Sequence, residues 1–229
     1  TIITCMNGIP HWYFHKLDNE YANYKIKCLD PNLRIDTILP PDNIVGSVVY
    51  PACEIVKPGT IKHIAGNRFS LGEPEGSESD RLKFISEILK RAGFRAPIQK
   101  NIRDEIWLKL IGNLSFNPIS ALTGATLEQI CNDQGTEAIV RAMMTEAKII
   151  AEELGAKINM SIEKRIEGAR KVGAHKTSML QDIEAGKPIE IDSIIIAVKE
   201  LGELTCSPTP YIDTILNLTL QKAKLIGCL

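Results

Sequence analysis

Three polar side chains recur at four-residue intervals within the otherwise apolar stretch Glu105–Leu122. They are Lys109, Asn113 and Asn117, and they share one stripe if the segment is helical. A helix that is apolar almost all the way round is buried, and a buried ammonium or amide group needs a polar partner. We therefore expect the stripe to face a polar cleft or a ligand. The alternative is that Lys109 extends its amine to solvent while the asparagines bind nearby loops.

A second group of polar residues lies in the segment His175–Asp192. Gly186 and Pro188 are expected to end a short helix there, and Glu190 is expected to open the next one. A carboxylate at a helix N-terminus is favoured by the helix dipole, so capping alone accounts for Glu190 as well as a functional role does. Ser178 likewise fits an N-terminal cap or a first-turn position.

A third candidate is Asn7, which with Gly8 directly follows the β-branched run 1–6. Ligands of open α/β sheets bind at the carboxyl ends of strands, which favours a functional role. Asn-Gly is also a common turn sequence, and a turn alone accounts for the pair. No G-x-G-x-x-G and no P-loop sequence occurs in the 229 residues, so spacing by itself identifies no cofactor.

The composition excludes several classes of protein. Of 229 residues, 44% are hydrophobic and 24% are charged, and 27 Lys and Arg against 28 Asp and Glu give a net charge of −1. These values are typical of a globular chain and argue against a disordered, collagen-like or nucleic-acid-binding protein. No apolar run approaches the roughly 20 residues of a membrane helix, and no signal-peptide pattern is present. We therefore expect a cytoplasmic protein that binds neither nucleic acid nor membrane.

Six cysteines are spread through the chain without a C-x-x-C pair. Zinc-ligand spacing is absent, so no metal site is expected, and a disulfide framework is unusual in a chain of this size. We expect reduced thiols that lie mostly in the interior.

The character of the sequence changes near residue 100. Before it, Pro and Gly punctuate short β-like runs, and after it helical spacing dominates. In the first part we predict strands over 1–6 and 44–50, a hairpin of 59–65 and 68–71 across Gly66-Asn67, a helix over 77–92 and a strand over 94–98. In the second part we predict helices over 104–122, 137–154, 162–172, 177–185, 190–204 and 210–226. The pattern predicts a partial α/β domain followed by an all-α helical domain.

Five segments, taken together, resemble the ketopantoate reductases (2-dehydropantoate 2-reductases). In chain order they read CMNGIPHW (5–12), GSVVYPA…PGTIKH (46–63), GNRFSLGEP (66–74), EIWLKLIGNLSFNPISALTG (105–124) and HKTSMLQDIEAGKPIEID (175–192). Chains of that family begin with a dinucleotide-binding half that carries G-x-G-x-x-G, so the resemblance starts at the later Rossmann strands and further residues upstream are expected. It implies that residues 1–100 are the C-terminal part of the dinucleotide-binding (Rossmann-like) domain. Residues 101–229 then form a helical substrate-binding and dimerisation domain.

The resemblance also implies a role for each residue of the stripe. Lys109 matches the family's catalytic lysine, which contacts the substrate and donates a proton to the ketone oxygen. Asn113 and Asn117 match substrate-binding asparagines, and Ser178 matches a substrate-binding serine. A positioned ammonium can both stabilise the negative charge that develops on the carbonyl oxygen and deliver the proton, so these assignments agree with the chemistry of ketone reduction.

Three further residues match contacts to NADPH, the cofactor that the resemblance implies. Asn7 matches an asparagine between the nicotinamide ribose and the substrate, and Ala52 aligns with a backbone contact to the cofactor. Glu190 matches a glutamate near the cofactor ribose and the substrate. The residues that discriminate NADP from NAD belong to the half that is absent from this sequence. A homodimer is expected from the frequency of dimers among soluble enzymes.

The expected activity is therefore NADPH-dependent reduction of 2-dehydropantoate to (R)-pantoate, an oxidoreductase step in pantothenate and coenzyme A biosynthesis. Some family members carry a further substrate asparagine soon after the Asn-Pro element, where this chain reads Thr123–Leu127. That difference leaves open a reductase of another branched 2-oxo acid. The absent glycine-rich half leaves open a third possibility, a non-catalytic helical interaction module.

Overall fold

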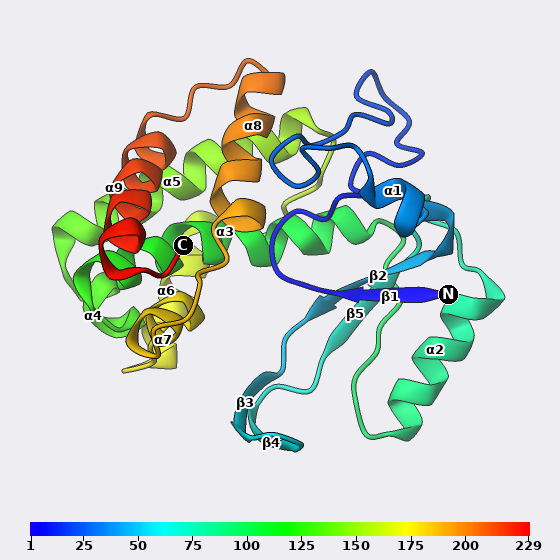
Figure 1. Cartoon of the computed structure of the whole chain (residues 1–229), viewed down its shortest axis with the longest axis horizontal. Helices are drawn as coiled ribbons and strands as arrows, with labels where there is room; N and C mark the ends of the chain where they lie inside the picture. The colour runs from blue at the N-terminus through cyan, green and yellow to red at the C-terminus, as the bar shows by residue number, and fades with distance from the viewer. The chain divides into compact units, whose positions relative to one another are not determined.

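The computed structural model describes residues 1–229 and divides them into two compact units. The N-terminal unit comprises Thr1–Lys25 and Asn32–Ile106, and the helical unit comprises Ile26–Pro31 and Trp107–Leu229. Figure 1 shows strands concentrated in the first unit and helices in the second. The predicted fold class, a partial Rossmann-like α/β domain followed by an all-α domain, is confirmed.

A three-stranded sheet forms the centre of the N-terminal unit. Strand β1 (Ile2–Cys5) runs parallel to β2 (Ile44–Val49), and β2 pairs antiparallel with β5 (Phe69–Gly72). Helix α2 (Asp80–Arg91) begins at the cap Ser79 and contributes Leu82 to a buried cluster with Val45 and Leu71. Two short turns of helix, α1 (Ile35–Ile38) and a 3-10 turn (Pro41–Asn43), precede β2. The predicted strands at the start of the chain and at residue 44 therefore form, and they are parallel neighbours.

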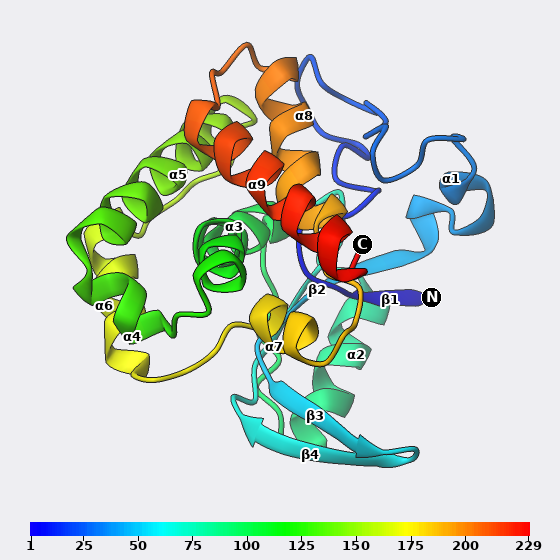
Figure 2. The same cartoon turned by 60° about the vertical axis from the view of Figure 1, so that its left-hand side comes forward.

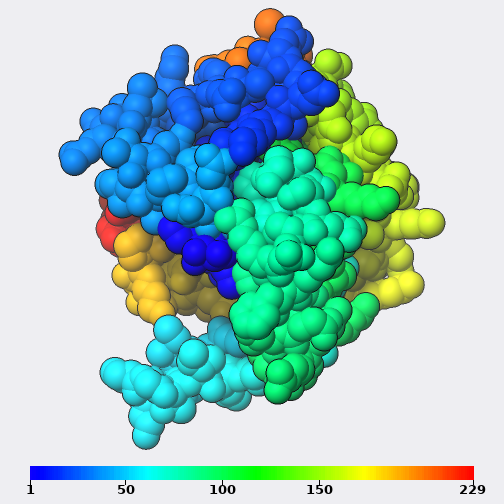
Figure 3. Space-filling model, turned by 90° about the vertical axis from the view of Figure 1, so that its right-hand side faces the viewer, coloured from blue at the N-terminus to red at the C-terminus, as the bar shows by residue number.

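The predicted hairpin across Gly66-Asn67 is wrong. The hairpin joins β3 (Ala52–Lys57) to β4 (Thr60–Ala65), with Gly59 at φ +77° in its turn, whereas β5 pairs with the central strand β2. Gly66 instead lets the chain pass close to another segment, because a Cβ there would lie 2.8 Å from the carbonyl oxygen of Tyr50. In the observed pairing with β2, Leu71 of β5 is completely buried. In Figure 3 the β3–β4 hairpin stands out from the neighbouring part of the N-terminal unit.

Residues 94–98 do not form the predicted strand. They run parallel beside β5 without forming a continuous ladder: isolated bridges join Arg95 to Arg68 and Ile98 to Leu71, and the amide nitrogens of Phe69 and Leu71 donate to the carbonyl oxygens of Arg95 and Pro97 at 2.8 and 2.9 Å. A buried hydrogen-bond network lies shortly after residue 98. Its centre is Arg103, which donates to the carbonyl oxygens of Tyr13, His15 and Pro74 at 2.7, 2.9 and 2.6 Å. The Arg103 guanidinium therefore ties the loop after β1 to the segment after β5.

The helical unit is built around the long helix α3 (Ile102–Thr123), whose first turn belongs to the N-terminal unit. Figure 2 looks along the later part of α3, with α4, α5, α7 and α9 arranged around it. The elements that follow α3 in the chain are α4 (Leu127–Asn132), α5 (Gln134–Glu153), α6 (Ile162–Val172), α7 (Ser178–Glu184), the π-helical turn η2 (Asp192–Ile196), α8 (Ala197–Leu204) and α9 (Pro210–Ile226). The predicted ranges of α6 and α9 are those observed, whereas α4 was not predicted. Its capping box between Thr126 and Gln129 is a signal that could have revealed it.

Side chains from one helix satisfy the backbone ends of another within this unit. The Glu146 carboxylate on α5 accepts hydrogen bonds from the amide nitrogens of Tyr211 and Ile212, at 2.9 Å each, and so caps the N-terminus of α9. Lys222 on α9 donates to the carbonyl oxygens of Ala121 and Leu122 at the end of α3. The Glu146 contacts hold α9 against α5, and the Lys222 contacts hold α9 against α3, the helix that carries the predicted stripe.

The short segment Ile26–Pro31 joins the helical unit although the chain on either side belongs to the other one. Glu200 on α8 accepts hydrogen bonds from the amide nitrogens of Lys27 and Cys28 at 2.7 and 2.9 Å. Burial, and then the Glu200 carboxylate, raise the pKa of the Cys28 thiol to about 12. The segment Ile26–Pro31 is thus held against α8 through its backbone.

The expectation that the thiols lie mostly in the interior is wrong. Cys131 and Cys228 are buried, but Cys5, Cys53 and Cys206 are exposed. Two of the exposed thiols lie on outlying strands, the edge strand β1 and the protruding hairpin, where packing against a core is not available. All six cysteines are free thiols. None of the helices combines the length and the apolar character needed to cross a membrane.

Candidate functional site

Helix α3 positions the predicted stripe. Its other faces are closed by packing, since Trp107, Leu110 and Leu114 are at most 1% exposed. Along the stripe, Lys109 and Asn113 are half-buried and Asn117 is buried. Successive members are rotated by about 40° and the whole stripe spans roughly 12 Å, from the geometry of an α-helix. The helix is thus apolar nearly all round, as predicted, and the stripe combines one amine with two amides.

The electrostatic environment of Lys109 is unusual for a lysine. Burial lowers the pKa of its amine to about 8, the Glu190 carboxylate opposes that shift, and the Arg165 guanidinium adds to it. Both charged groups therefore lie near enough to Lys109 to affect its protonation. An amine with a pKa close to working pH is well suited to donate a proton, because its ammonium form is abundant and its conjugate base is not strongly basic.

Ser178 lies at the first residue of α7, and it is not the cap of that helix. Thr177 is the cap, with its hydroxyl oxygen accepting from the amide nitrogen of Leu180 at 3.3 Å. Capping therefore does not explain Ser178, whose side chain is exposed at the start of the helix. The same short helix carries Asp182, whose pKa is raised by burial and by the Glu190 carboxylate.

Glu190 does not open a helix, contrary to the prediction. The next helical residue is Asp192, at the start of η2, so Glu190 precedes the helix by two positions. Ile189 and Ile191 on either side are buried, and the amide nitrogen of Ile189 donates to the carbonyl oxygen of Cys228 at 3.0 Å. This hydrogen bond holds the segment between α7 and η2, in which Glu190 is exposed between two buried neighbours. Its influence on Lys109, rather than capping, is what the structure reveals about this carboxylate.

Asn7 and Ala52 lie at one edge of the sheet in the N-terminal unit. Strands β1 and β2 are parallel with Cys5 opposite Ser47, so the residues that follow both strands emerge at the same edge. Asn7 follows β1 and Ala52 follows β2. Carboxyl ends of parallel strands are where α/β sheets bind their ligands. The placement of these two residues relative to Lys109 stays a prediction.

The residues present suit one end of a dinucleotide and not the other. The half-buried amide of Asn7 and the backbone at Ala52 follow the carboxyl ends of two parallel strands, a position where a sugar hydroxyl or an amide of a ligand finds hydrogen-bond partners. Pyrophosphate binding depends on a glycine-rich turn at a helix N-terminus, and no G-x-G-x-x-G sequence occurs in these 229 residues. No group of three or more His, Cys, Asp or Glu side chains is placed to bind a metal ion.

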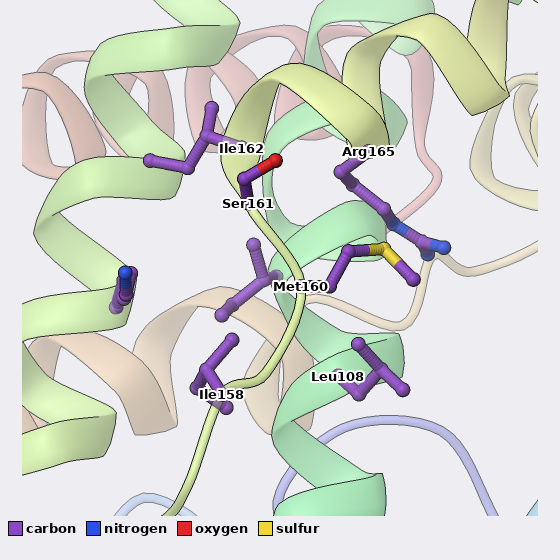
Figure 4. A pocket seen from close by; sticks show the side chains of 8 residues that line it. Leu108, Ile158, Met160, Ser161, Ile162 and Arg165 are labelled. Carbon is purple, nitrogen blue, oxygen red and sulfur yellow. The ribbon is translucent and has the colours of Figure 1, made fainter.

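Arg165 on α6 is a charged neighbour of the stripe that the sequence did not single out. It also borders a small cavity between α3 and α6, shown in Figure 4, in which Leu108, Ile158 and Met160 supply apolar side chains. The cavity has a volume of about 10 Å³, which is near the minimum for a single water molecule and far too small for an organic acid. The cavity is therefore a packing gap beside the stripe and not the substrate site.

Comparison with known proteins finds a family model and a relative that point to the same family. The model of the family described as "Ketopantoate reductase PanE/ApbA C terminal" matches residues 101–223. A 2-dehydropantoate 2-reductase of Mesorhizobium japonicum is 49% identical over 228 residues, which cover 100% of this chain and 70% of that protein.

Two solved structures are similar to this chain. A protein of Ralstonia solanacearum assigned to the ketopantoate reductases is 40% identical with a TM-score of 0.95, over 99% of this chain and 69% of its own. A D-mandelate dehydrogenase, solved with NADH and anilino(oxo)acetate, shares the fold at 19% identity and a TM-score of 0.80, over 98% of this chain and 68% of its own. Both the family model and the Mesorhizobium relative cover the stripe on α3, and the chain belongs to the ketopantoate reductase family.

Proposed function

We propose that this chain carries the substrate-binding and proton-donating part of a 2-dehydropantoate 2-reductase. The observation that carries the proposal is Lys109, a half-buried amine with its pKa lowered to about 8, in line with two amides on a buried helix. The 49% identity to a relative of that name supports the substrate and the reaction. The reaction is the reduction of 2-dehydropantoate to (R)-pantoate, as part of pantothenate and coenzyme A biosynthesis.

Each residue of the stripe has a distinct task in this proposal. The Lys109 ammonium holds its proton at the keto oxygen, stabilises the negative charge that grows there during reduction, and then transfers the proton to it. Asn113 and Asn117 hydrogen-bond the substrate, and Ser178 contributes a hydroxyl from the start of α7. Because these amide and hydroxyl groups are neutral, they orient the substrate without neutralising the positive charge of Lys109.

The cofactor of the proposal is NADPH, which supplies the hydride when bound. Asn7 and Ala52 would hold its nicotinamide end from the sheet edge of residues 1–100, which we assign to the dinucleotide-binding domain. Glu190 would contact the ribose from residues 101–229, which we assign to the substrate-binding domain. Glu190 would also keep Lys109 protonated, since its carboxylate raises the pKa of that amine.

A second candidate function is the reduction of a different branched 2-oxo acid. Two observations favour it: residues Thr123–Leu127 at the end of α3 differ from the substrate-asparagine pattern, and the fold is shared with a D-mandelate dehydrogenase. The test uses the protein expressed from its complete reading frame, with NADPH consumption followed for 2-dehydropantoate and for other branched 2-oxo acids. We expect the highest kcat/KM with 2-dehydropantoate, and a higher value with another acid would replace the substrate assignment.

We also propose that the protein is a homodimer that associates through α9. Tyr211, Leu218 and Leu225 are 49%, 52% and 76% exposed and recur every seven residues, which is the repeat of a helix–helix seam. The last two line an apolar groove of about 470 Å³ formed by α3, α5 and α9. A seam of this kind suits a two-fold interface, in which the same surface of a second copy covers it.

Replacing Leu218 by glutamate is expected to convert the dimer to a monomer in light scattering, because a desolvated carboxylate at the centre of the seam has no partner. The matched control is Asn217→Glu, which places the same charge on the neighbouring exposed residue. A monomeric wild-type protein at micromolar concentration, or equal dissociation by both variants, would contradict the assignment of α9.

A further inference from the structure

The guanidinium of Arg165 lies directly against the backbone of α3 at Gly112. A Cβ built on Gly112 would lie 2.2 Å from Nη2, 2.7 Å from Nε and 2.9 Å from Cζ of Arg165, so no larger residue fits while the guanidinium stays there. Glycine is the least favourable residue in a helix interior apart from proline. Its presence in the middle of this 22-residue helix is explained by the close approach of the arginine.

The contact places the guanidinium beside the stripe. Gly112 immediately precedes Asn113 and follows Lys109 by three positions, which is a rise of about 5 Å along the helix. The Arg165 charge acts on Lys109, since it lowers the pKa of that amine. In Figure 4 the Arg165 guanidinium points away from Ile158 and Ile162, on the side of the cavity where Met160 lies. The arginine therefore adds a second cation next to the proposed proton donor.

We propose that Arg165 binds the carboxylate of the 2-oxo acid, which leaves Lys109 to act on the adjacent keto oxygen. This assignment rests on the proposed function, because it presupposes an anionic substrate at the stripe. A planar guanidinium matches a carboxylate with two parallel hydrogen bonds, which an ammonium cannot reproduce. In a 2-oxo acid the carboxylate is bonded directly to the keto carbon. The carboxylate and the keto oxygen are therefore neighbours, and two neighbouring cations can each bind one of them.

The charge balance supports the same assignment. The Lys109 ammonium and the Arg165 guanidinium repel each other, and the Glu190 carboxylate offsets only part of that repulsion, because the three groups together carry one net positive charge. An anionic substrate placed between the two cations offsets the remainder, whereas a neutral substrate would not. The site is thereby selective for an acid over its ester or lactone, and the selectivity depends on Arg165.

The first test compares an acid with a neutral analogue in the protein from its complete reading frame. Arg165→Met is expected to raise KM for the 2-oxo acid roughly 10- to 100-fold, the effect of losing a charge-assisted hydrogen bond. The KM for the methyl ester of the same acid should stay near the wild-type value. Arg165→Lys should recover part of the loss. Gly112→Ala, which displaces the guanidinium without removing it, should raise KM for the acid as well.

The matched control is Lys164→Met, which removes an exposed cation from the neighbouring position of α6 and should change neither KM. If Arg165→Met alters acid and ester equally, or no more than Lys164→Met does, the arginine only packs against α3 and the assignment is overturned. If the wild type does not reduce 2-dehydropantoate, the proposed function fails, and the comparison is made with whichever 2-oxo acid it reduces.

A binding measurement keeps the test independent of turnover. Oxamate is an unreactive anion with the shape of a 2-oxo acid, and calorimetry with saturating NADPH measures its affinity. The wild type and Lys164→Met are expected to bind it equally, and Arg165→Met at least tenfold more weakly. Equal affinity in all three proteins, or no binding by the wild type, would overturn the assignment.

Discussion

Replacing Lys109 by alanine is expected to lower kcat for the 2-oxo acid by about 100-fold or more, which is the usual contribution of a positioned general acid. The variant loses both the proton and the positive charge at the keto oxygen, and the neutral amides of Asn113 and Asn117 cannot replace either. The folded state should be little affected, because burial already opposes the charged form of this amine. Steady-state kinetics with NADPH and a thermal melt of the same preparations measure both quantities.

The pH dependence of the wild-type enzyme follows from the same residue. With a pKa of about 8, the amine is protonated and active below that value. The kcat/KM, which reports groups of the free enzyme, is therefore expected to be level at neutral pH and to fall about tenfold per unit as the pH rises beyond 8. For the variant Lys109→Ala the matched control is Lys148→Ala, which removes another half-buried lysine of the same unit. An unchanged kcat in Lys109→Ala, or an equal loss in Lys148→Ala, would remove Lys109 from the mechanism.

Replacing Arg103 by alanine is expected to lower the free energy of unfolding by about 3 kcal/mol or more. Its guanidinium donates to three carbonyl oxygens, those of Tyr13, His15 and Pro74, and lies 5.5 Å from the centre of the Tyr13 ring. Hydrogen bonds from a charged donor are among the stronger ones, and the truncation leaves three carbonyl oxygens without this donor. Urea denaturation measures the loss.

The control for that variant is Arg95→Ala, which removes an exposed arginine of the same unit. A surface change of this kind is expected to cost less than about 0.5 kcal/mol. Arg103→Lys should lie between the two, because an ammonium keeps the charge but cannot span three separated carbonyl groups. If Arg103→Ala were no more destabilising than Arg95→Ala, the loop after β1 would be held by other contacts.

Local signals in the sequence predicted the helices well and the hairpin badly. The helical spacing predicted the ranges of α6 and α9 as observed, with Pro210 at the first position of α9, and the structure adds Gly227 as its left-handed C-cap. The sheet depends instead on which strand buries Leu71, a long-range choice that the Gly66-Asn67 pair does not encode. Residues 94–98 do lie parallel beside β5, but their backbone hydrogen bonds and bridges do not continue into a regular strand.

The candidate site was only partly accessible to sequence reasoning. Spacing alone placed Lys109, Asn113 and Asn117 on one stripe, because all three belong to one helix and a helix has a fixed period. Arg165 comes from another helix, so nothing in the spacing connects it to Gly112. An interior glycine in an otherwise strong helix was the one available hint of a close approach. Residues on separate elements meet only after packing, which a single sequence does not show.

The pKa of Lys109 is the quantity that tests the account most directly. Lysine labelled with carbon-13 at Cε gives one NMR signal per side chain, and the signal that disappears in Lys109→Arg identifies the residue. Titration of the free protein is expected to show a midpoint of about 8 for this amine. A midpoint near 10.4, the value of an exposed lysine, would contradict both its burial beside Arg165 and its role as the proton donor.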